Sequence, residues 1–148
     1  MVEGELAAGT SFMNSRGLLH FDAHFENILT DGQRLYFADY GLAISSGFEL
    51  SRDDADFFDR HQTYDRCYTA TYLVYWLATA LYQSNDRHAL VRAWAEGTPP
   101  VGIGEKVAAI LARHAPIATV MSDFNLKFQH QSRQIRYPLE EIRQLGGL

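Results

Sequence analysis

The chain has 148 residues, of which 47% are hydrophobic and 13% aromatic, and its formal net charge at pH 7 is -5. A chain of this size and composition can bury a hydrophobic core, which excludes a disordered or fibrous protein. Only 13 residues are Lys or Arg, too few for the basic surface that usually binds nucleic acid. We therefore expect no nucleic-acid partner.

The amino-terminal residues and the cysteine content indicate the compartment. Acidic residues stand at positions 3 and 5, where a secretory signal would carry basic ones, and no long apolar run follows them. Cys67 is the only cysteine, so an internal disulfide is excluded, and we expect its thiol to be buried and unreactive. These features favour a cytoplasmic protein.

The first part of the chain predicts one helix and one β-hairpin. Residues 3–14 are expected to form a short helix that Gly17 ends. Residues 18–27 mix polar and apolar side chains without a clear period, which is typical of a loop held against a core. The short β-prone runs at 28–30 and 35–38 are separated by Asp-Gly-Gln-Arg, a sequence that predicts a hairpin.

The position of the turn decides which residues of the hairpin face each other. If the turn is centred on Gly32 and Gln33, with glycine in the first turn position, Asn27 lies opposite Ala38 and Asp39 falls beside it. If the turn is centred one residue earlier, on Asp31 and Gly32, Tyr36 lies opposite Asn27. Asp39 is then displaced along the strand by about 10 Å from Asn27, at roughly 3.4 Å per residue. We predict the first register, because it brings Asn27 and Asp39 together.

The second part of the chain is expected to be helical. The acidic run at 53–59 is typical of the solvent-exposed start of a helix, where negative charge is favourable. Pro116 and Pro138 can each open a helix, since proline fits the first helical position. From Thr63 onward the pattern predicts helices at about 64–83, 86–96, 103–115, 116–130 and 139–145.

The uncharged stretch at 67–85 is long enough to resemble a membrane span. It contains four Tyr and three Thr residues, whereas a span needs about 20 predominantly apolar residues. We therefore expect a buried central helix and no membrane partner. Together the elements predict a single α+β domain over residues 1–148, mainly helical, with a small β-hairpin at its front.

One polar segment carries residue types that suit phosphoryl transfer. It runs from His20 to Asn27 and is followed, twelve residues after Asn27, by Asp39-Tyr40-Gly41. Moving a phosphoryl group requires a carboxylate that orients the attacking hydroxyl, and oxygen ligands that hold magnesium against the phosphates. Asp22 suits the first task, and Asn27 and Asp39 suit the second, because Mg²⁺ prefers oxygen donors to imidazole.

The string H-x-D-x-H-x-x-N followed by D-Y-G resembles the catalytic and metal-binding loops of the protein-kinase-like superfamily. The resemblance is closest to its small-molecule branch, which includes aminoglycoside phosphotransferases and choline kinases. It implies a kinase-like carboxy-terminal lobe, ATP and Mg²⁺ as cofactors, and a hydroxyl of a small molecule as the acceptor. It implies Asp22 as the catalytic base with His20 bracing its loop. The cofactor-binding residues that it implies are His24, Asn27 and Asp39, of which Asn27 and Asp39 are the metal ligands.

Other positions take their meaning from the same resemblance. Asp65, near the start of the long helix, is similar to the structural acid that anchors the catalytic loop, and Asp59 competes for this role. Phe21 stands where relatives have Gly or Arg, so the chain lacks the arginine through which many protein kinases sense activation-loop phosphorylation. His24 replaces the lysine of protein-kinase catalytic loops, which favours a small-molecule acceptor. Glu26 adds negative charge near the site.

The resemblance also implies a part that this sequence does not show. None of the seventeen residues before Leu18 is a lysine, and no glycine-rich phosphate loop precedes the motif. We therefore expect that the amino-terminal ATP-gripping lobe is absent and that the isolated chain does not catalyse. It is then a fragment, a lobe completed by a protein partner, or a non-catalytic, pseudokinase-like binding module. Such a module should expose an apolar patch at Leu29, Tyr36, Phe37 and Leu42.

The alternative chemistry is that of a metal hydrolase. Asp22-Ala23-His24 resembles a ligand segment of arginase-like ureohydrolases, and Asp54, Asp56 and Asp59 imitate a second one. Two such clusters would hold paired manganese. That fold alternates strands and helices over a much longer chain, whereas the second half here is predicted to be helical.

Overall fold

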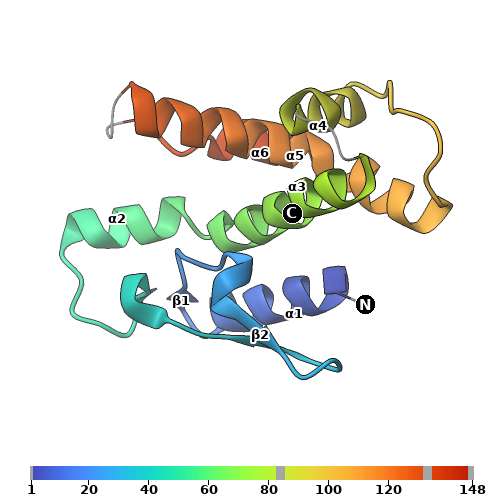
Figure 1. Cartoon of the computed structure of the whole chain (residues 1–148). Coiled ribbons are helices and arrows are strands. Elements are labelled where there is room, and N and C mark those ends of the chain that lie inside the picture. Colours follow the sequence, from blue (N-terminus) through green and yellow to red (C-terminus); the bar gives the residue numbers. More distant parts are fainter. Residues whose placement is uncertain (1, 83–85, 132–134, 147–148) are drawn as a thin grey trace. The chain divides into compact units, whose positions relative to one another are not determined.

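The computed structural model describes residues 2–82, 86–131 and 135–146, and Figure 1 shows its elements in chain order. By their internal contacts the residues fall into two compact units, Met1–Thr69 and Ala70–Leu148. Strands occur in the first unit and helices in both, so the predicted α+β, mainly helical class is confirmed. The single domain over residues 1–148 stays a prediction.

The first unit begins with helix α1 (Val2–Ser15), which contacts the strands β1 (Leu18–Leu19) and β3 (Leu35–Phe37). Gly17 has a φ of 69° and ends the helix, and its N–H donates to the carbonyl of Asn14 at 2.9 Å. The predicted helix and its glycine cap are confirmed. The buried residues of α1 recur every three or four positions, as on a helix with one face against a core: Leu6, Thr10 and Met13.

The predicted hairpin is formed by β2 (Ile28–Thr30) and β3, which pair antiparallel. The N–H of Ala38 donates to the carbonyl of Asn27 at 2.9 Å, directly beside the first strand pair. Gly32, in the turn, has a φ of 87°, which glycine adopts without the steric cost of a Cβ. The register that sets Asn27 opposite Ala38 is therefore confirmed.

A second two-stranded ribbon goes beyond the sequence prediction. Strand β1 pairs antiparallel with β4 (Ile44–Ser45), with Leu18 opposite Ser45. The N–H of Ser46 extends this pairing by donating to the carbonyl of Gly17 at 2.8 Å. Strands of two residues are too short to show a hydrophobic period, which is why the sequence predicts a loop there.

The acidic run forms helix α2 (Arg52–Arg60), as its composition predicts. Ser51 caps this helix, because its Oγ accepts from the N–H of Asp54 at 3.2 Å and donates to the Asp54 carboxylate at 2.6 Å. Asp53 and Asp54 lie in the first turn, where negative charge stabilises the positive end of the helix dipole. These carboxylates thus have a structural explanation.

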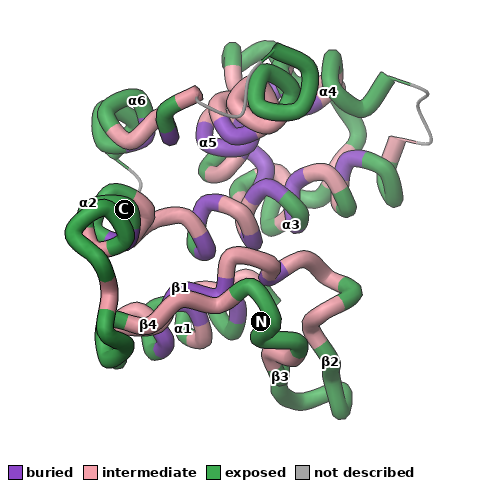
Figure 2. Tube along the Cα trace, turned by 90° about the vertical axis from the view of Figure 1, so that its left-hand side faces the viewer, coloured by how far each residue is buried: buried purple, intermediate pink, exposed green. Residues whose placement is uncertain are grey.

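The second unit consists of helices. Most of α3 (Tyr64–Tyr82) belongs to it, together with α4 (Arg87–Ala95), α5 (Glu105–His130) and α6 (Leu139–Gln144). Figure 2 shows buried stretches along α3 and α5 in purple. Side chains from α3, α4 and α5 form the core of this unit: Val74, Ala78, Val91, Trp94, Leu111, Ala115 and Ala118.

The long helix α3 agrees with the prediction over residues 64–82, while Gln83 lies outside the described residues. Cys67 is 1% exposed, so its predicted burial is confirmed. No helix in the described part of the chain is both long and apolar enough to cross a membrane. Residues 83–85, at the end of the uncharged stretch, are not among those described.

The predicted helix break at Pro116 is wrong, because α5 continues through this residue. A proline cannot donate to the carbonyl four residues earlier, so the helix lacks one backbone hydrogen bond there. Leu111 and Ala115 before the proline, and Ala118 after it, are fully buried in the core of the unit. Packing of this face therefore outweighs the local preference of proline for a helix start.

The turn of the hairpin is held by the carboxylate of Asp31. Its Oδ1 accepts from the N–H groups of Gln33 and Arg34, each at 2.8 Å, and its Oδ2 accepts from the hydroxyl of Tyr36 at 2.8 Å. These donors, led by the N–H of Arg34, lower the pKa of Asp31 below its ordinary value of 3.8. The ionised carboxylate therefore stabilises the turn.

This arrangement predicts a pH dependence of the hairpin. Because the folded pKa of Asp31 is the lower one, its contribution is fully present above pH 3.8 and is lost as the pH falls through the lowered pKa. We expect the amide NMR signals of Gln33 and Arg34 to move toward random-coil positions with a midpoint below pH 3.8. A midpoint at or above the ordinary value would contradict this account of the turn.

Candidate active site

The loop that carries the candidate residues is held by a buried carboxylate in the first turn of α3. Asp65 is fully buried and accepts from the N–H of His20 at 2.6 Å and from the N–H of Phe21 at 2.9 Å. Burial raises the pKa of Asp65, and these two N–H groups oppose the rise. Asp65 therefore anchors the loop, while its competitor Asp59 is exposed on α2.

His20 is fully buried and joins this loop to the residue before Asp39. Its Nε2 donates to the carbonyl of Ala38 at 2.9 Å, and its Nδ1 accepts from the N–H of Asp22 at 3.3 Å. The ring also lies 4.7 Å from the ring of Tyr40. These contacts fit the bracing role expected of His20.

The structure brings Asp22, Asn27 and His24 together. Asn27 ends the 3₁₀ helix η1 (Phe25–Asn27), and its Nδ2 donates to Asp22 Oδ2 and to the Asp22 carbonyl, both at 3.0 Å. His24 Nε2 lies 3.5 Å from Asp22 Oδ1, and these side chains are 21% and 29% exposed. The Asp22 carboxylate is thus oriented by its neighbours and still accessible, as a group that reaches an acceptor hydroxyl must be.

Asp39 lies directly after Ala38, whose N–H is bonded to the carbonyl of Asn27. Its backbone is left-handed, with φ 57° and ψ 74°, and its carboxylate caps the 3₁₀ helix η2 (Tyr40–Leu42) by accepting from the N–H of Gly41 at 3.3 Å. A residue other than glycine held in this conformation costs about 1 kcal/mol or more. The hairpin register therefore sets Asp39 beside Asn27, at the end of one ribbon.

The donor atoms at this end of the ribbon suit magnesium. Because Asp22 engages the amide nitrogen of Asn27, the oxygen Oδ1 of Asn27 is the atom that remains for a cation. The carboxylate of Asp39 supplies a second oxygen donor. In proteins Mg²⁺ commonly takes one or two such ligands and completes its shell with phosphate oxygens and water. Asn27 Oδ1 and the Asp39 carboxylate are therefore the oxygen donors here that could hold a magnesium ion.

The alternative of a paired manganese site gains no support. Asp54 is engaged by its helix cap Ser51. Among the residues that the structure describes beyond β4, the regular elements are all helices, without the alternating strands that an arginase-like fold requires. In the described ranges no three His, Cys, Asp or Glu residues are grouped so that they could hold a metal ion, either at Asp54, Asp56 and Asp59 or at Asp22, His24 and Asp39.

Phe21 was not a candidate from the sequence, yet its backbone is unusual. Its φ is 62°, which a bulky residue rarely adopts. Its ring lies among aromatic rings from α2 and α3, and its N–H is bonded to Asp65. Phenylalanine itself does not predict this conformation, although the resembled family has glycine among its residues at this position, and glycine favours a positive φ.

The expected apolar patch is present in part. Leu29, Tyr36 and Leu42 are 60%, 48% and 65% exposed. Phe37 is half-buried instead, because its ring packs against α1 at Gly9, where an added Cβ would collide with it. The exposed apolar side chains expected for a binding module are therefore those of the first three residues.

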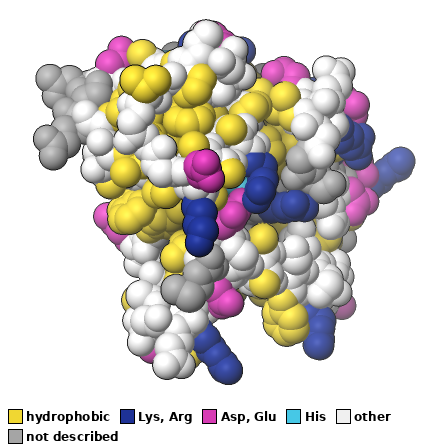
Figure 3. Space-filling model, turned by 90° about the vertical axis from the view of Figure 1, so that its right-hand side faces the viewer, with side chains coloured by type: hydrophobic (Ala, Val, Ile, Leu, Met, Phe, Trp, Pro, Cys, Tyr) yellow, Lys and Arg dark blue, Asp and Glu magenta, His cyan; other side chains and the backbone are white. Residues whose placement is uncertain are grey.

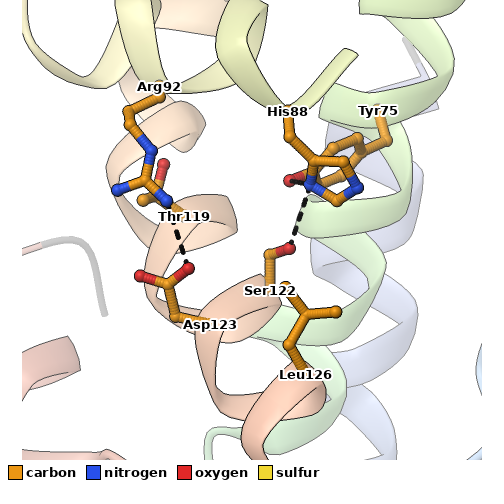
Figure 4. Close-up of a pocket in the computed structure, with 7 residues that line it drawn as sticks. All are labelled: Tyr75, His88, Arg92, Thr119, Ser122, Asp123 and Leu126. Atoms are coloured by element: carbon orange, nitrogen blue, oxygen red, sulfur yellow. Dashed lines mark hydrogen bonds and ion pairs between the residues drawn. The ribbon is translucent and has the colours of Figure 1, made fainter. Parts of the chain in front are cut away.

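A separate pocket of about 80 Å³ lies in the second unit (Figure 4). Within it, Tyr75 Oη and Ser122 Oγ lie 2.9 Å and 3.4 Å from His88 Nδ1, and Arg92 pairs with Asp123 at 3.2 Å. These polar groups engage one another, and the sequence analysed alone places none of them in a site. The pocket is lined by α3, α4 and α5: Tyr75, His88, Arg92, Thr119, Ser122, Asp123 and Leu126.

The surface charges are mixed on the face drawn in Figure 3, where Lys and Arg side chains are interspersed with acidic ones. The absence of a nucleic-acid partner stays a prediction, as does the resemblance of residues 18–41 to kinase-like loops.

Comparisons with protein-family models, with curated proteins and with solved structures found no match to this chain.

Proposed function

We propose that the chain carries the acceptor-orienting and magnesium-binding part of an ATP-dependent phosphotransferase that acts on a hydroxyl of a small molecule. The observation that carries the proposal is the placement of Asp22, Asn27 and Asp39. Asn27 contacts the Asp22 carboxylate at 3.0 Å, and the hydrogen bond from Ala38 to Asn27 sets Asp39 next to it. A carboxylate base and two oxygen ligands are the parts that phosphoryl transfer needs.

Each side chain has a distinct task in this proposal. ATP would supply the γ-phosphoryl group and release ADP, with magnesium neutralising charge on the phosphates. Asn27 Oδ1 and the Asp39 carboxylate would hold the metal. Asp22 accepts a hydrogen bond from the acceptor hydroxyl and takes its proton as the new O–P bond forms. His24, 3.5 Å from Asp22, adds a donor near the transferred group.

A thermal-shift titration of the full chain with ATP and Mg²⁺ tests the proposal. A ligand that binds only the folded state raises Tm as its concentration increases. We expect this rise for the parent chain, a smaller rise without Mg²⁺, and its loss in Asp39→Asn. Asp59→Asn, which changes an exposed carboxylate of α2, should keep the rise. No rise in the parent, or equal rises in both variants, would contradict the magnesium site.

A second candidate function is a non-catalytic module that binds a protein partner. The exposure of Leu29, Tyr36 and Leu42 favours it, since Leu29 and Tyr36 lie opposite each other on the hairpin and exposed apolar surface marks interaction sites. Such a module needs no nucleotide. Sedimentation of the full chain over a range of concentrations separates the two candidates. The binding module is favoured if the chain associates, if Leu42→Ser reduces this association, and if MgATP does not change Tm. The phosphotransferase is favoured if the chain is a monomer and MgATP raises its Tm.

A further inference from the structure

The backbone of Phe21 is fixed from two sides within the first unit. Asp65 accepts from its N–H at 2.9 Å, which sets the position of the nitrogen. The ring of Phe21 lies 5.4 Å from the ring of Phe57, 5.7 Å from that of His61 and 5.1 Å from that of Tyr64, between centroids. Aromatic rings attract one another at these separations. The ring contacts therefore set the position of the Phe21 side chain.

These two constraints decide the direction in which the chain enters Asp22. The positions of the nitrogen, Cα and Cβ of a residue fix the direction of the bond from Cα to the carbonyl carbon, through which the chain continues to the next residue. At Phe21 the resulting φ is 62°. A strained backbone angle of this kind persists only where the surroundings determine it. The carboxylate of Asp22 then meets Asn27 at 3.0 Å and His24 at 3.5 Å.

Phe57 in helix α2 and His61 directly after this helix form a pair of rings against which the ring of Phe21 lies. His61 Nδ1 donates to the carbonyl of Phe57, one turn earlier, at 2.7 Å. The two rings stack with centroids 3.9 Å apart and an interplanar angle of 28°. Burial lowers the pKa of His61, which favours the neutral ring. Phe57 is 40% exposed, so its ring can be changed without opening the core of the unit.

We infer that Phe57 and His61 are positioning residues for Asp22, and that they act through the ring of Phe21. The inference rests on the proposed function, because it concerns the orientation of the candidate base. The rings of Phe57 and His61 contact the ring of Phe21 and each other, and Phe21 directly precedes Asp22, so a change in these rings reaches Asp22 through the backbone angle at Phe21. A contact between aromatic rings needs no phosphate group, so this positioning of Asp22 does not depend on phosphorylation of the chain.

Amide hydrogen exchange of the full chain, measured by NMR without nucleotide, tests this inference. The N–H groups of His20, Phe21 and Asp22 all have acceptors, so their exchange reports on the order of the loop. We expect Phe57→Leu to speed their exchange about tenfold or more while the amides of α1 exchange as in the parent. Phe57→Tyr keeps the ring and should retain slow exchange.

Phe48→Leu is the matched control, because Phe48 lies in the same unit and is 64% exposed. It should leave exchange in the loop unchanged. Equal exchange of the loop in Phe57→Leu and Phe48→Leu, or equal acceleration in α1, would overturn the positioning role. If Phe57→Leu does not fold, His61→Leu removes the other ring of the stacked pair. Its amide exchange in the loop and in α1 is then compared with that of Phe48→Leu in the same way.

Failure of the proposed function gives a different pattern from failure of this inference. If only the proposed function is wrong, loop exchange still responds to Phe57→Leu, while MgATP does not raise the Tm of the parent chain. If only the positioning role is wrong, MgATP raises the Tm, and loop exchange is the same in Phe57→Leu as in Phe48→Leu.

Discussion

Asp65→Ala is expected to lower the free energy of unfolding by about 2–5 kcal/mol. The substitution removes the carboxylate that accepts from the N–H groups of both His20 and Phe21. A buried donor left without an acceptor costs about 1–3 kcal/mol, and a domain is stable by only about 5–15 kcal/mol in total. Urea unfolding followed by circular dichroism should show a lower midpoint.

Asp53→Ala is the matched control for this substitution. Asp53 is also an acid in the first turn of a helix, but it is exposed. Its replacement removes only a favourable interaction with the helix dipole, worth about 1 kcal/mol or less. Equal unfolding midpoints for Asp53→Ala and Asp65→Ala would contradict the anchoring role of Asp65.

The raised pKa of Asp65 adds a pH dependence with a defined sign. Because burial sets the folded pKa above the ordinary value of 3.8, ionisation of Asp65 costs more in the folded state than in the unfolded one. Its contribution to stability therefore declines as the pH rises from 3.8 through the raised pKa. Asp65→Asn cannot ionise, so its stability curve should lack this decline.

Asp22→Asn is expected to lower the rate of phosphoryl transfer by about 10²–10⁴-fold, the contribution typical of a positioned general base. The assay requires the phosphotransferase that we propose, in which an ATP-gripping lobe would complete this chain within one polypeptide or as a second one. An asparagine oxygen can still accept from Asn27, so the geometry of the loop is retained. We therefore expect the loss in kcat, with little change in the KM for ATP.

Glu26→Gln is the control for the charge change at Asp22. Glu26 lies in the same loop, is exposed, and loses the same negative charge on substitution. It should change kcat by less than about threefold, in the range of an ordinary surface substitution. A kcat for Asp22→Asn as high as that of Glu26→Gln would remove Asp22 as the base.

Features of the site that follow from local chemistry are predictable from the sequence. Gly32 predicts the turn of the hairpin and leaves two registers, of which the one that brings Asn27 and Asp39 together is the one observed. Gly17 ends α1 for the same conformational reason. The anchoring by Asp65 has no local signal, and it is foreseen only because the motif resembles a family in which an acid at this place holds the loop.

Features that depend on contacts between distant segments escape the sequence. The ribbon of β1 and β4 is too short to show a pattern, and the strained backbone of Phe21 results from rings on α2 and α3. Pro116 is a local signal that tertiary packing overrides. The polar groups of the pocket in Figure 4 come from three helices, so no short motif joins them.

The most direct measurement replaces Mg²⁺ by paramagnetic Mn²⁺ in the presence of ATP and records the amide NMR signals of the full chain. Broadening by Mn²⁺ falls steeply with distance, so it locates the metal. We predict that the signals of Asn27, Ala38 and Asp39 broaden first, and that they no longer do so in Asp39→Asn. Broadening centred on the acidic run of α2, or spread evenly over the surface acids, would contradict a metal site at the end of the hairpin.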